Sequence, residues 1–323
     1  MKKSPQTTAP AAQIKQKTEW TPYLLILPAV VLIFGVMLYP LCKTFYLAFQ
    51  NYNPTTPYAN GFAGFGNFIK LFSKGEFYSS LLVSLKWVVA LVILQLIFGM
   101  IVALILNQNF KGRGFFRALV FIPWAMSGVL TAVLFNLIYN QNYGVLNDIL
   151  TKMGLIDEPV AWLANTHLVL GAVIVAELWR GIPFFAISLL AAMQGLPQDV
   201  YEAAKVDGAT KLETFRSVTL PLLKDTIVLT TLLRTIWEFN SVDLIFSLTN
   251  GGPVGKTTTL SMLIANQALT TNNYGYGSAI SVVSFLILTI IAIIYISSCS
   301  FYCSGLLCAL LSLTCIFFTI NNL

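Results

Sequence analysis

Five charged side chains lie within two of the long apolar runs of the sequence, and their types and spacing could do chemistry. They are Glu177, Arg180, Arg234, Glu238 and Asp243. Residues three or four apart share one face of a helix, so Glu177 could pair with Arg180, and Arg234 with Glu238. Charges in apolar surroundings are costly and usually face a wet cavity or the interior of a helix bundle. Two interpretations stay open: a polar pathway for a solute, and structural ion pairs within the bundle or against a partner.

Several other chemistries are disfavoured by the residue types present. His167 is the single histidine, which excludes a multi-histidine metal site and leaves a packing or hydrogen-bonding role. The five cysteines form no CxxC pair, so neither zinc nor a redox couple is indicated. The stretch NGGPVGKT (250–257) resembles a phosphate-binding loop, but Asn250 stands where that motif requires glycine. We therefore expect no catalytic residue, metal, cofactor or ATP site in this chain.

The composition indicates what must position these charges. Of the residues, 57% are hydrophobic and 10% are charged, against about a quarter charged in a soluble domain. This excludes a soluble enzyme and a disordered chain. The net charge of +6 is scattered between apolar runs, so no nucleic-acid surface is predicted. The expected class is an all-α polytopic membrane protein in contact with lipid.

Six runs are long enough for a helix of roughly 20 residues to cross the membrane. They are 23–49, 81–106, 118–139, 168–193, 226–248 and 278–296. The first is too long for a signal peptide and lacks a small-residue cleavage site. The sequence thus predicts an N-terminal tail (1–20), a six-helix transmembrane domain (21–296) and an uncharged, cysteine-rich tail (297–323). That last tail is either a seventh apolar segment or an altered end, and we assign it no function.

The distribution of Lys and Arg predicts the orientation. Twelve of these basic residues lie on one side of the membrane, in the N-terminal tail and in the connections after the second and fourth spans. Arg180 is counted with the connection after the fourth span. Four lie in the connections on the other side. We therefore expect the N-terminus in the cytoplasm. The outer connections, at about 51–80, 140–167 and 249–277, are rich in Gly, Asn and aromatic residues and could form an outer gate or meet an external partner.

The most polar stretch between spans is LPQDVYEAAKVDGATKLETFRSVTLPLLK (196–224). Pro197 can start a helix that Gly208 stops. Thr210 can cap the next helix, with Glu213 as its capping-box partner. Small side chains at Ala203 and Ala204 would let another protein approach closely. An ordinary solvated hairpin remains the alternative.

The spacing within this loop resembles the EAA signature of membrane subunits of binding-protein-dependent ABC importers. The matching residues are Glu202, Ala203, Ala204, Gly208, Leu220 and Pro221, with Val218 where isoleucine is usual. Trp179, Pro183-Phe184, Gln194, Asp207 and the segments 61–72, 107–117 and 238–261 are similar to the carbohydrate-uptake branch, of the maltose and glycerol-3-phosphate permease type. The resemblance covers about 20–296.

That resemblance implies a six-span type I importer permease in the bacterial inner membrane, with a cytoplasmic coupling helix. Its partners would be a second related permease, two ATPase subunits that bind ATP and Mg, and an extracytoplasmic solute-binding protein. Glu202, Ala203, Ala204, Asp207, Gly208, Leu220 and Pro221 would carry coupling to the ATPase.

For a carbohydrate, the pathway would need hydrogen-bonding groups and aromatic faces. The predicted pathway residues are Arg234, Trp237, Glu238, Asn240 and Asp243. A free Arg234 would favour an acidic saccharide, whereas a neutral one would tolerate a paired Arg234. The alternative function is a stand-alone, ion-coupled secondary transporter that uses Glu177, Glu238 and Asp243, but it leaves the Ala-Ala-Gly loop unexplained.

Overall fold

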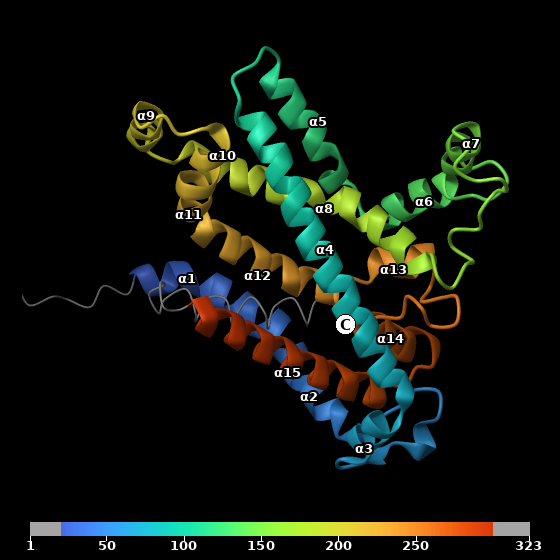
Figure 1. Cartoon of the computed structure of the whole chain (residues 1–323). Helices are drawn as coiled ribbons and strands as arrows, with labels where there is room; N and C mark the ends of the chain where they lie inside the picture. The colour runs from blue at the N-terminus through green and yellow to red at the C-terminus, as the bar shows by residue number, and fades with distance from the viewer. Residues whose placement is uncertain (1–20, 300–323) are drawn as a thin grey trace, which may run out of the picture.

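The computed structural model describes residues 21–299, and helices make up most of them (Figure 1). The predicted N-terminal tail and positions 300–323 of the predicted C-terminal tail lie outside the described residues. Within the described part, four helical segments are long and apolar enough to cross a membrane, or five if one bent pair counts as a span. The predicted all-α polytopic class is confirmed, but two of the six predicted spans are broken.

The first two spans are joined by a connection that contains two short strands and two short helical segments. The first comprises α1 (Thr21–Leu32), a π-helical segment η1 (Ile33–Leu38) and α2 (Tyr39–Ala48), and the second is α4 (Gly75–Asn107). Between them lie β1 (Gln50–Asn51), a 3-10 turn η2 (Pro57–Ala59), β2 (Gly61–Phe62) and α3 (Gly66–Ser73). The two strands pair antiparallel, with Gln50 opposite Phe62.

The predicted third span, 118–139, is two helices. They are α5 (Arg113–Ala125) and α6 (Gly128–Ile138), which meet at an angle of 95°. Pro123 removes a backbone donor from the last turn of α5, and Ser127 starts the next helix by accepting a hydrogen bond from Leu130 N at 3.3 Å. A short helix, α7 (Val145–Lys152), follows.

The predicted fifth span, 226–248, is also not continuous. Helix α12 (Lys224–Asn240) ends before Ser241, and α13 (Asp243–Leu248) begins two residues later. The 17 residues of α12 reach only about 25 Å, less than the roughly 30 Å of a hydrocarbon core. Ser241 adopts an extended backbone at the end of α12, as short polar residues often do where a helix stops.

The remaining helices include the fourth and sixth spans. They are α8 (Val169–Gln194), α9 (Gln198–Val206), α10 (Lys211–Thr214), the π-helical η3 (Phe215–Thr219), α11 (Leu220–Leu222), α14 (Leu260–Ala265), the π-helical η4 (Asn266–Thr270) and α15 (Tyr274–Cys299). Arg180 lies in the middle of α8 rather than in a connection. Removing it from the charge count leaves eleven basic residues against four, so the predicted asymmetry persists.

Helix α8 crosses α4, and this crossing forms the centre of the molecule (Figure 1). A methyl group added to Gly99 of α4 would overlap Cβ of Phe185, so the two helices approach closely there. The largest apolar core includes the buried Trp87, Leu91 and Val173. A separate small cluster joins α2 to α15. The start of α1, the end of α15 and α9 lie toward the left of Figure 1, whereas α3, α7 and α14 lie toward its lower and right parts.

Candidate functional site

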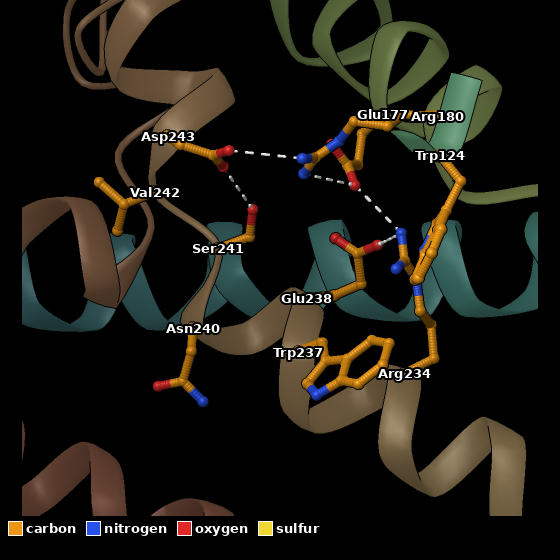
Figure 2. Close-up of a pocket in the computed structure, with 10 residues that line it drawn as sticks. All are labelled: Trp124, Glu177, Arg180, Arg234, Trp237, Glu238, Asn240, Ser241, Val242 and Asp243. Atoms are coloured by element: carbon orange, nitrogen blue, oxygen red, sulfur yellow. Dashed lines mark hydrogen bonds and ion pairs between the residues drawn. The ribbon is translucent and has the colours of Figure 1, made fainter. Parts of the chain in front are cut away.

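A polar pocket of about 400 Å³ opens where the broken helices meet the middle of α8 (Figure 2). Its lining comes from the end of α5, from α8, and from the junction of α12 with α13. The lining residues are Trp124, Glu177, Arg180, Arg234, Trp237, Glu238, Asn240, Ser241, Val242 and Asp243. We refer to this space as the central pocket.

Glu177 of α8 links the two arginines of the central pocket. Its carboxylate lies 2.9 Å from Arg180 Nη2 and 3.0 Å from Arg234 Nη2. Arg234 also contacts Glu238 at 2.6 Å, one helical turn along α12. Arg180 reaches across to Asp243 of α13, at 3.4 Å. The predicted pairs Glu177–Arg180 and Arg234–Glu238 are confirmed, and they are parts of one network across three helices.

Gln95 of α4 holds the inner side of this network. Its side-chain oxygen accepts from Arg234 Nε at 2.7 Å, and its amide nitrogen donates to Glu238 Oε1 at 3.1 Å. The Trp87 indole also donates to the backbone oxygen of Glu238, at 3.1 Å. A methyl group added to Gly181 would overlap Gln95 Nε2. The glycine therefore gives Gln95 and Arg234 the space to meet beside α8.

Burial of the charged side chains decreases toward the mouth of the pocket. The side chains of Glu177 and Glu238 are 1% exposed, that of Arg180 is 19% exposed and that of Asp243 is 46% exposed. Buried ion pairs seldom add net stability, because desolvation cancels much of their attraction. Oε2 of Glu238 is buried without a hydrogen-bond partner within the described residues. A gain in stability alone therefore does not account for this network.

Aromatic side chains cover part of the central pocket. Trp237 packs against Phe184, with ring centroids 5.0 Å apart, and the Arg234 guanidinium lies 5.9 Å from the centre of the Phe184 ring. Trp124 comes from the last turn of α5, next to the bend before α6. Indole faces beside charged hydrogen-bonding groups provide both contacts that a polyhydroxylated ring can use: apolar C–H faces and polar edges.

The structure brings all five predicted pathway residues to the wall of the central pocket: Arg234, Trp237, Glu238, Asn240 and Asp243. It adds Ser241, Val242 and Trp124, which the sequence analysis did not select. Gln95 was also missed, although a lone amide within the apolar second span was a usable signal. Trp124 had no such signal, because its position depends on the bend between α5 and α6. His167 lies outside the pocket and is exposed.

The loop 196–224 forms α9, α10, η3 and α11 at the left end of Figure 1. Gly208 ends α9 with φ of 76°, a left-handed conformation that favours glycine. The predicted capping box is confirmed: Thr210 N and Oγ1 both donate to the Glu213 carboxylate at 2.7 Å. These hydrogen bonds hold the pKa of Glu213 below its ordinary value, with the backbone bond contributing most.

The predicted contact residues of this loop lie largely at its surface. Glu202, Ala203, Asp207, Gly208, Leu220 and Pro221 are exposed, and Ala204 is half-buried. Two apolar side chains beside them are also open to solvent, Val206 at 88% and Leu212 at 59%. Tyr201 Oη and Thr219 Oγ1 lie 3.2 Å apart, which ties α9 to η3. The surface thus combines small, apolar and charged side chains on a helix pair held together by local hydrogen bonds.

Comparison with known proteins identifies relatives over most of the chain. It is 38% identical to the trehalose/maltose transport system permease protein of Thermococcus litoralis, over 88% of this chain and 95% of that protein. It is 31% identical to the sulfoquinovosyl glycerol transport system permease protein of Agrobacterium fabrum, over 90% and 97%, respectively. It is 32% identical to the multiple sugar-binding transport system permease protein of Streptococcus mutans, over 86% and 93%.

A solved structure shows the same fold. A chain of a bacterial ABC transporter involved in the import of the acidic polysaccharide alginate superimposes with a TM-score of 0.78 at 23% identity, over 88% of this chain and 96% of that one. Residues 95–301 match the model of the family described as binding-protein-dependent transport system inner membrane component. The chain therefore belongs to that family, as the resemblance in its 196–224 loop predicted.

Proposed function

We propose that this chain is the transmembrane subunit of an ATP-driven importer that moves a carbohydrate across the bacterial inner membrane. The observation that carries the proposal is the central pocket, which two broken helices build within a fold of this family. Discontinuous helices line solute sites in many transporters, because backbone groups freed at the breaks face a wet cavity. The relatives are named for trehalose, maltose and other sugars, which supports a carbohydrate as the solute.

The described contacts support an uncharged saccharide rather than an acidic one. Both arginines of the central pocket contact carboxylates, so neither guanidinium is free to receive an anion. Carboxylates also outnumber guanidinium groups by three to two among the lining residues. Trp124 and Trp237 would stack on the sugar rings, and Asn240, Asp243 and Arg180 would exchange hydrogen bonds with hydroxyl groups.

The 196–224 loop is our candidate for the contact with the ATPase. Ala203 and Ala204 allow close packing, Glu202 and Asp207 give polar contacts, and Gly208 fixes the turn. Leu220 and Pro221 begin the last short helix before α12. In this arrangement the N-terminus and the loop face the cytoplasm, in agreement with the excess of basic residues at that end. ATP hydrolysis would take place in two separate ATPase subunits, and a second permease and an external binding protein would complete the importer.

The alternative, an ion-coupled carrier, is less consistent with the pocket. Such a carrier needs a carboxylate that can exchange ions with water, but Glu177 and Glu238 are almost fully buried and paired with Arg234. Asp243 is accessible but contacts Arg180. The alternative also gives no role to the exposed helix pair at 196–224.

Uptake in membrane vesicles separates the two functions. We expect transport of a labelled disaccharide, such as maltose or trehalose, to require ATP and the binding protein, and to survive dissipation of ion gradients. Gentle solubilisation should retain a second permease and an ATPase with this chain. Uptake that follows the ion gradient and ignores ATP would overturn the proposal.

A further inference from the structure

A second polar cavity, also of about 400 Å³, lies at the end of the molecule that carries α9. It forms where the turn between α4 and α5 meets the end of α8 and the start of α9. Its lining residues are Asn107, Asn109, Arg113, Arg117, Met193, Gln194, Gln198 and Tyr201. We refer to it as the basic cavity. It shares no lining residue with the central pocket, and no carboxylate is among its lining residues.

The two arginines of the basic cavity have donors that no protein group in the described part of the chain accepts. Arg113 and Arg117 lie one turn apart on α5, so both guanidinium groups lie on the same side of that helix. The Nε atoms of both are shielded from solvent and have no hydrogen-bond partner within the described residues. Among residues 21–299, Arg113 Nη1 makes a single long contact, 3.5 Å, to Asn109 Oδ1. Unsatisfied guanidinium donors beside a cavity indicate a site for an oxyanion.

Gln194 provides a further clue to the ligand. With its amide oxygen turned toward the arginines, this exposed side chain accepts from Nη2 of Arg113 at 2.7 Å and from Nη2 of Arg117. One amide oxygen cannot also satisfy both Nε donors. A phosphate group offers several acceptor oxygens and matches the Nε–Nη2 edge of a guanidinium in bidentate geometry. It could therefore replace Gln194 and satisfy both arginines at once.

The surroundings of the basic cavity are suited to an amphiphilic ligand. On the same helix as the two arginines, Phe115 is 68% exposed and Leu119 is 49% exposed, which is typical of side chains that contact acyl chains. Lys111, just before α5, is exposed and adds positive charge. Asp199 and Glu202 belong to α9 but do not line the cavity. An anion here would bridge α5, α8 and the start of the 196–224 loop.

We propose that the basic cavity binds a phosphate group through Arg113 and Arg117, either the headgroup phosphate of an anionic phospholipid or a soluble phosphate. The orientation proposed above places the site at the cytoplasmic surface, where both sources are present. Binding itself does not depend on transport, so this proposal and the proposed function can fail separately.

The test uses the full chain with the subunits that co-purify with it, in nanodiscs of phosphatidylglycerol and phosphatidylcholine. Native mass spectrometry after detergent release measures retained lipid. We expect R113Q/R117Q to retain phosphatidylglycerol at least about tenfold less than the wild type, since charge-assisted hydrogen bonds are lost. The matched control, Lys111→Gln, removes a neighbouring charge outside the cavity and should retain the lipid.

A second measurement distinguishes the source of the phosphate. The second measurement is a titration with inorganic phosphate in neutral detergent. The ligand is a soluble phosphate if the wild type binds inorganic phosphate, R113Q/R117Q does not, and the wild type shows no selective retention of phosphatidylglycerol. If neither lipid nor phosphate distinguishes the wild type from R113Q/R117Q, the proposal is wrong. It is equally wrong if the double variant loses only its ATPase subunits, because the basic cavity would then be a protein contact.

Discussion

Gly181 is a residue at which added volume would disturb the central pocket. In Gly181→Ala the new methyl group would overlap Gln95 Nε2 and lie 2.5 Å from Arg234 Nη2. We expect normal membrane insertion but sugar uptake reduced roughly tenfold or more, since overpacking of this kind costs about 1–3 kcal/mol. Gly171→Ala is the matched control, because it lies on the same helix with nothing within 4 Å of the added methyl group. Equal uptake by the two variants would show that the Gln95–Arg234 contact is dispensable.

Substitution of Arg234 tests whether the ion-pair network of the central pocket is structural or takes part in transport. Arg234→Met leaves Glu177 and Glu238 close together without their shared cation, and we expect a loss of about 3–5 kcal/mol of stability. Adding Glu238→Met removes one buried carboxylate, so the double variant should regain much of the thermal stability in detergent but not the uptake. Recovery of uptake together with stability would mean that the pair is purely structural.

At the residue scale, local spacing predicted the pairs within one helix but not the network. Glu177–Arg180 and Arg234–Glu238 follow from three- and four-residue spacing. The contacts of Glu177 with Arg234 and of Arg180 with Asp243 join residues 57 and 63 positions apart. Such contacts depend on how α8, α12 and α13 cross, which a single sequence does not specify.

Among the elements, the turn after α9 gives a sharp test of coupling. Gly208 has φ of 76°, and no atom lies within 4 Å of a Cβ atom added to it. The strain caused by a substitution there would therefore come from the backbone conformation alone. Gly208→Val should therefore abolish transport-linked ATP hydrolysis, whereas Gly208→Asn should retain part of it, because asparagine tolerates this conformation. ATPase assays with and without the binding protein measure the effect.

Gly154 provides the control for that experiment. It also has a left-handed φ, 68°, and open space around it, but it follows α7, far along the chain from the 196–224 loop. We expect Gly154→Val to leave coupling unchanged. If both valine variants uncouple transport to the same degree, general destabilisation rather than the 196–224 loop explains the result.

The capping box of α10 should make this part of the loop sensitive to acid. The pKa of Glu213 is lowered in the folded loop. The contribution of its carboxylate to the stability of the loop is therefore complete at pH values above the ordinary Glu pKa of about 4.3. That contribution is lost as the pH falls through the lowered pKa. Amide exchange in α10, measured by mass spectrometry and corrected for intrinsic rates, should become faster below about pH 4. Glu213→Gln should remove most of this pH dependence.

Apolar runs predicted where most spans lie, but not where two of them break. Averaging hydropathy over about 20 residues hides short signals such as Pro123 followed by Ser127-Gly128, or Asn240-Ser241. Each of these signals is compatible with an unbroken helix that is merely kinked. Helix α6, which follows the 95° bend, packs against α13, and both helices pack against α8. These contacts account for the bend and for the short α13. Tertiary packing therefore decided what the local sequence left open.

For the whole molecule, the open side of the central pocket predicts dependence on a partner. The pocket remains open on the side of Asp243, whose side chain is 46% exposed. The side chains described in α1 are also exposed, as expected for a span that contacts lipid. A second permease that binds only the folded chain should raise its thermal stability by mass action. We expect the melting temperature in detergent to be several degrees higher for the co-expressed pair than for the chain alone. Identical melting curves would show that the chain is stable as an isolated subunit.

The continuity of α8 has a mechanical consequence. Glu177 and Arg180 lie in its middle, Gln194 is its last residue, and α9 begins four residues later. From Arg180 to Gln194 the helix is about 21 Å long, so a small rotation at the pocket end would become a larger displacement at the α9 end. A tilt of about 10° would displace the α9 end by roughly 4 Å, given that length. Conversely, a displacement of α9 by a few ångströms would rotate the Glu177–Arg180 face by only about 10°. The helix could make this movement and remain intact.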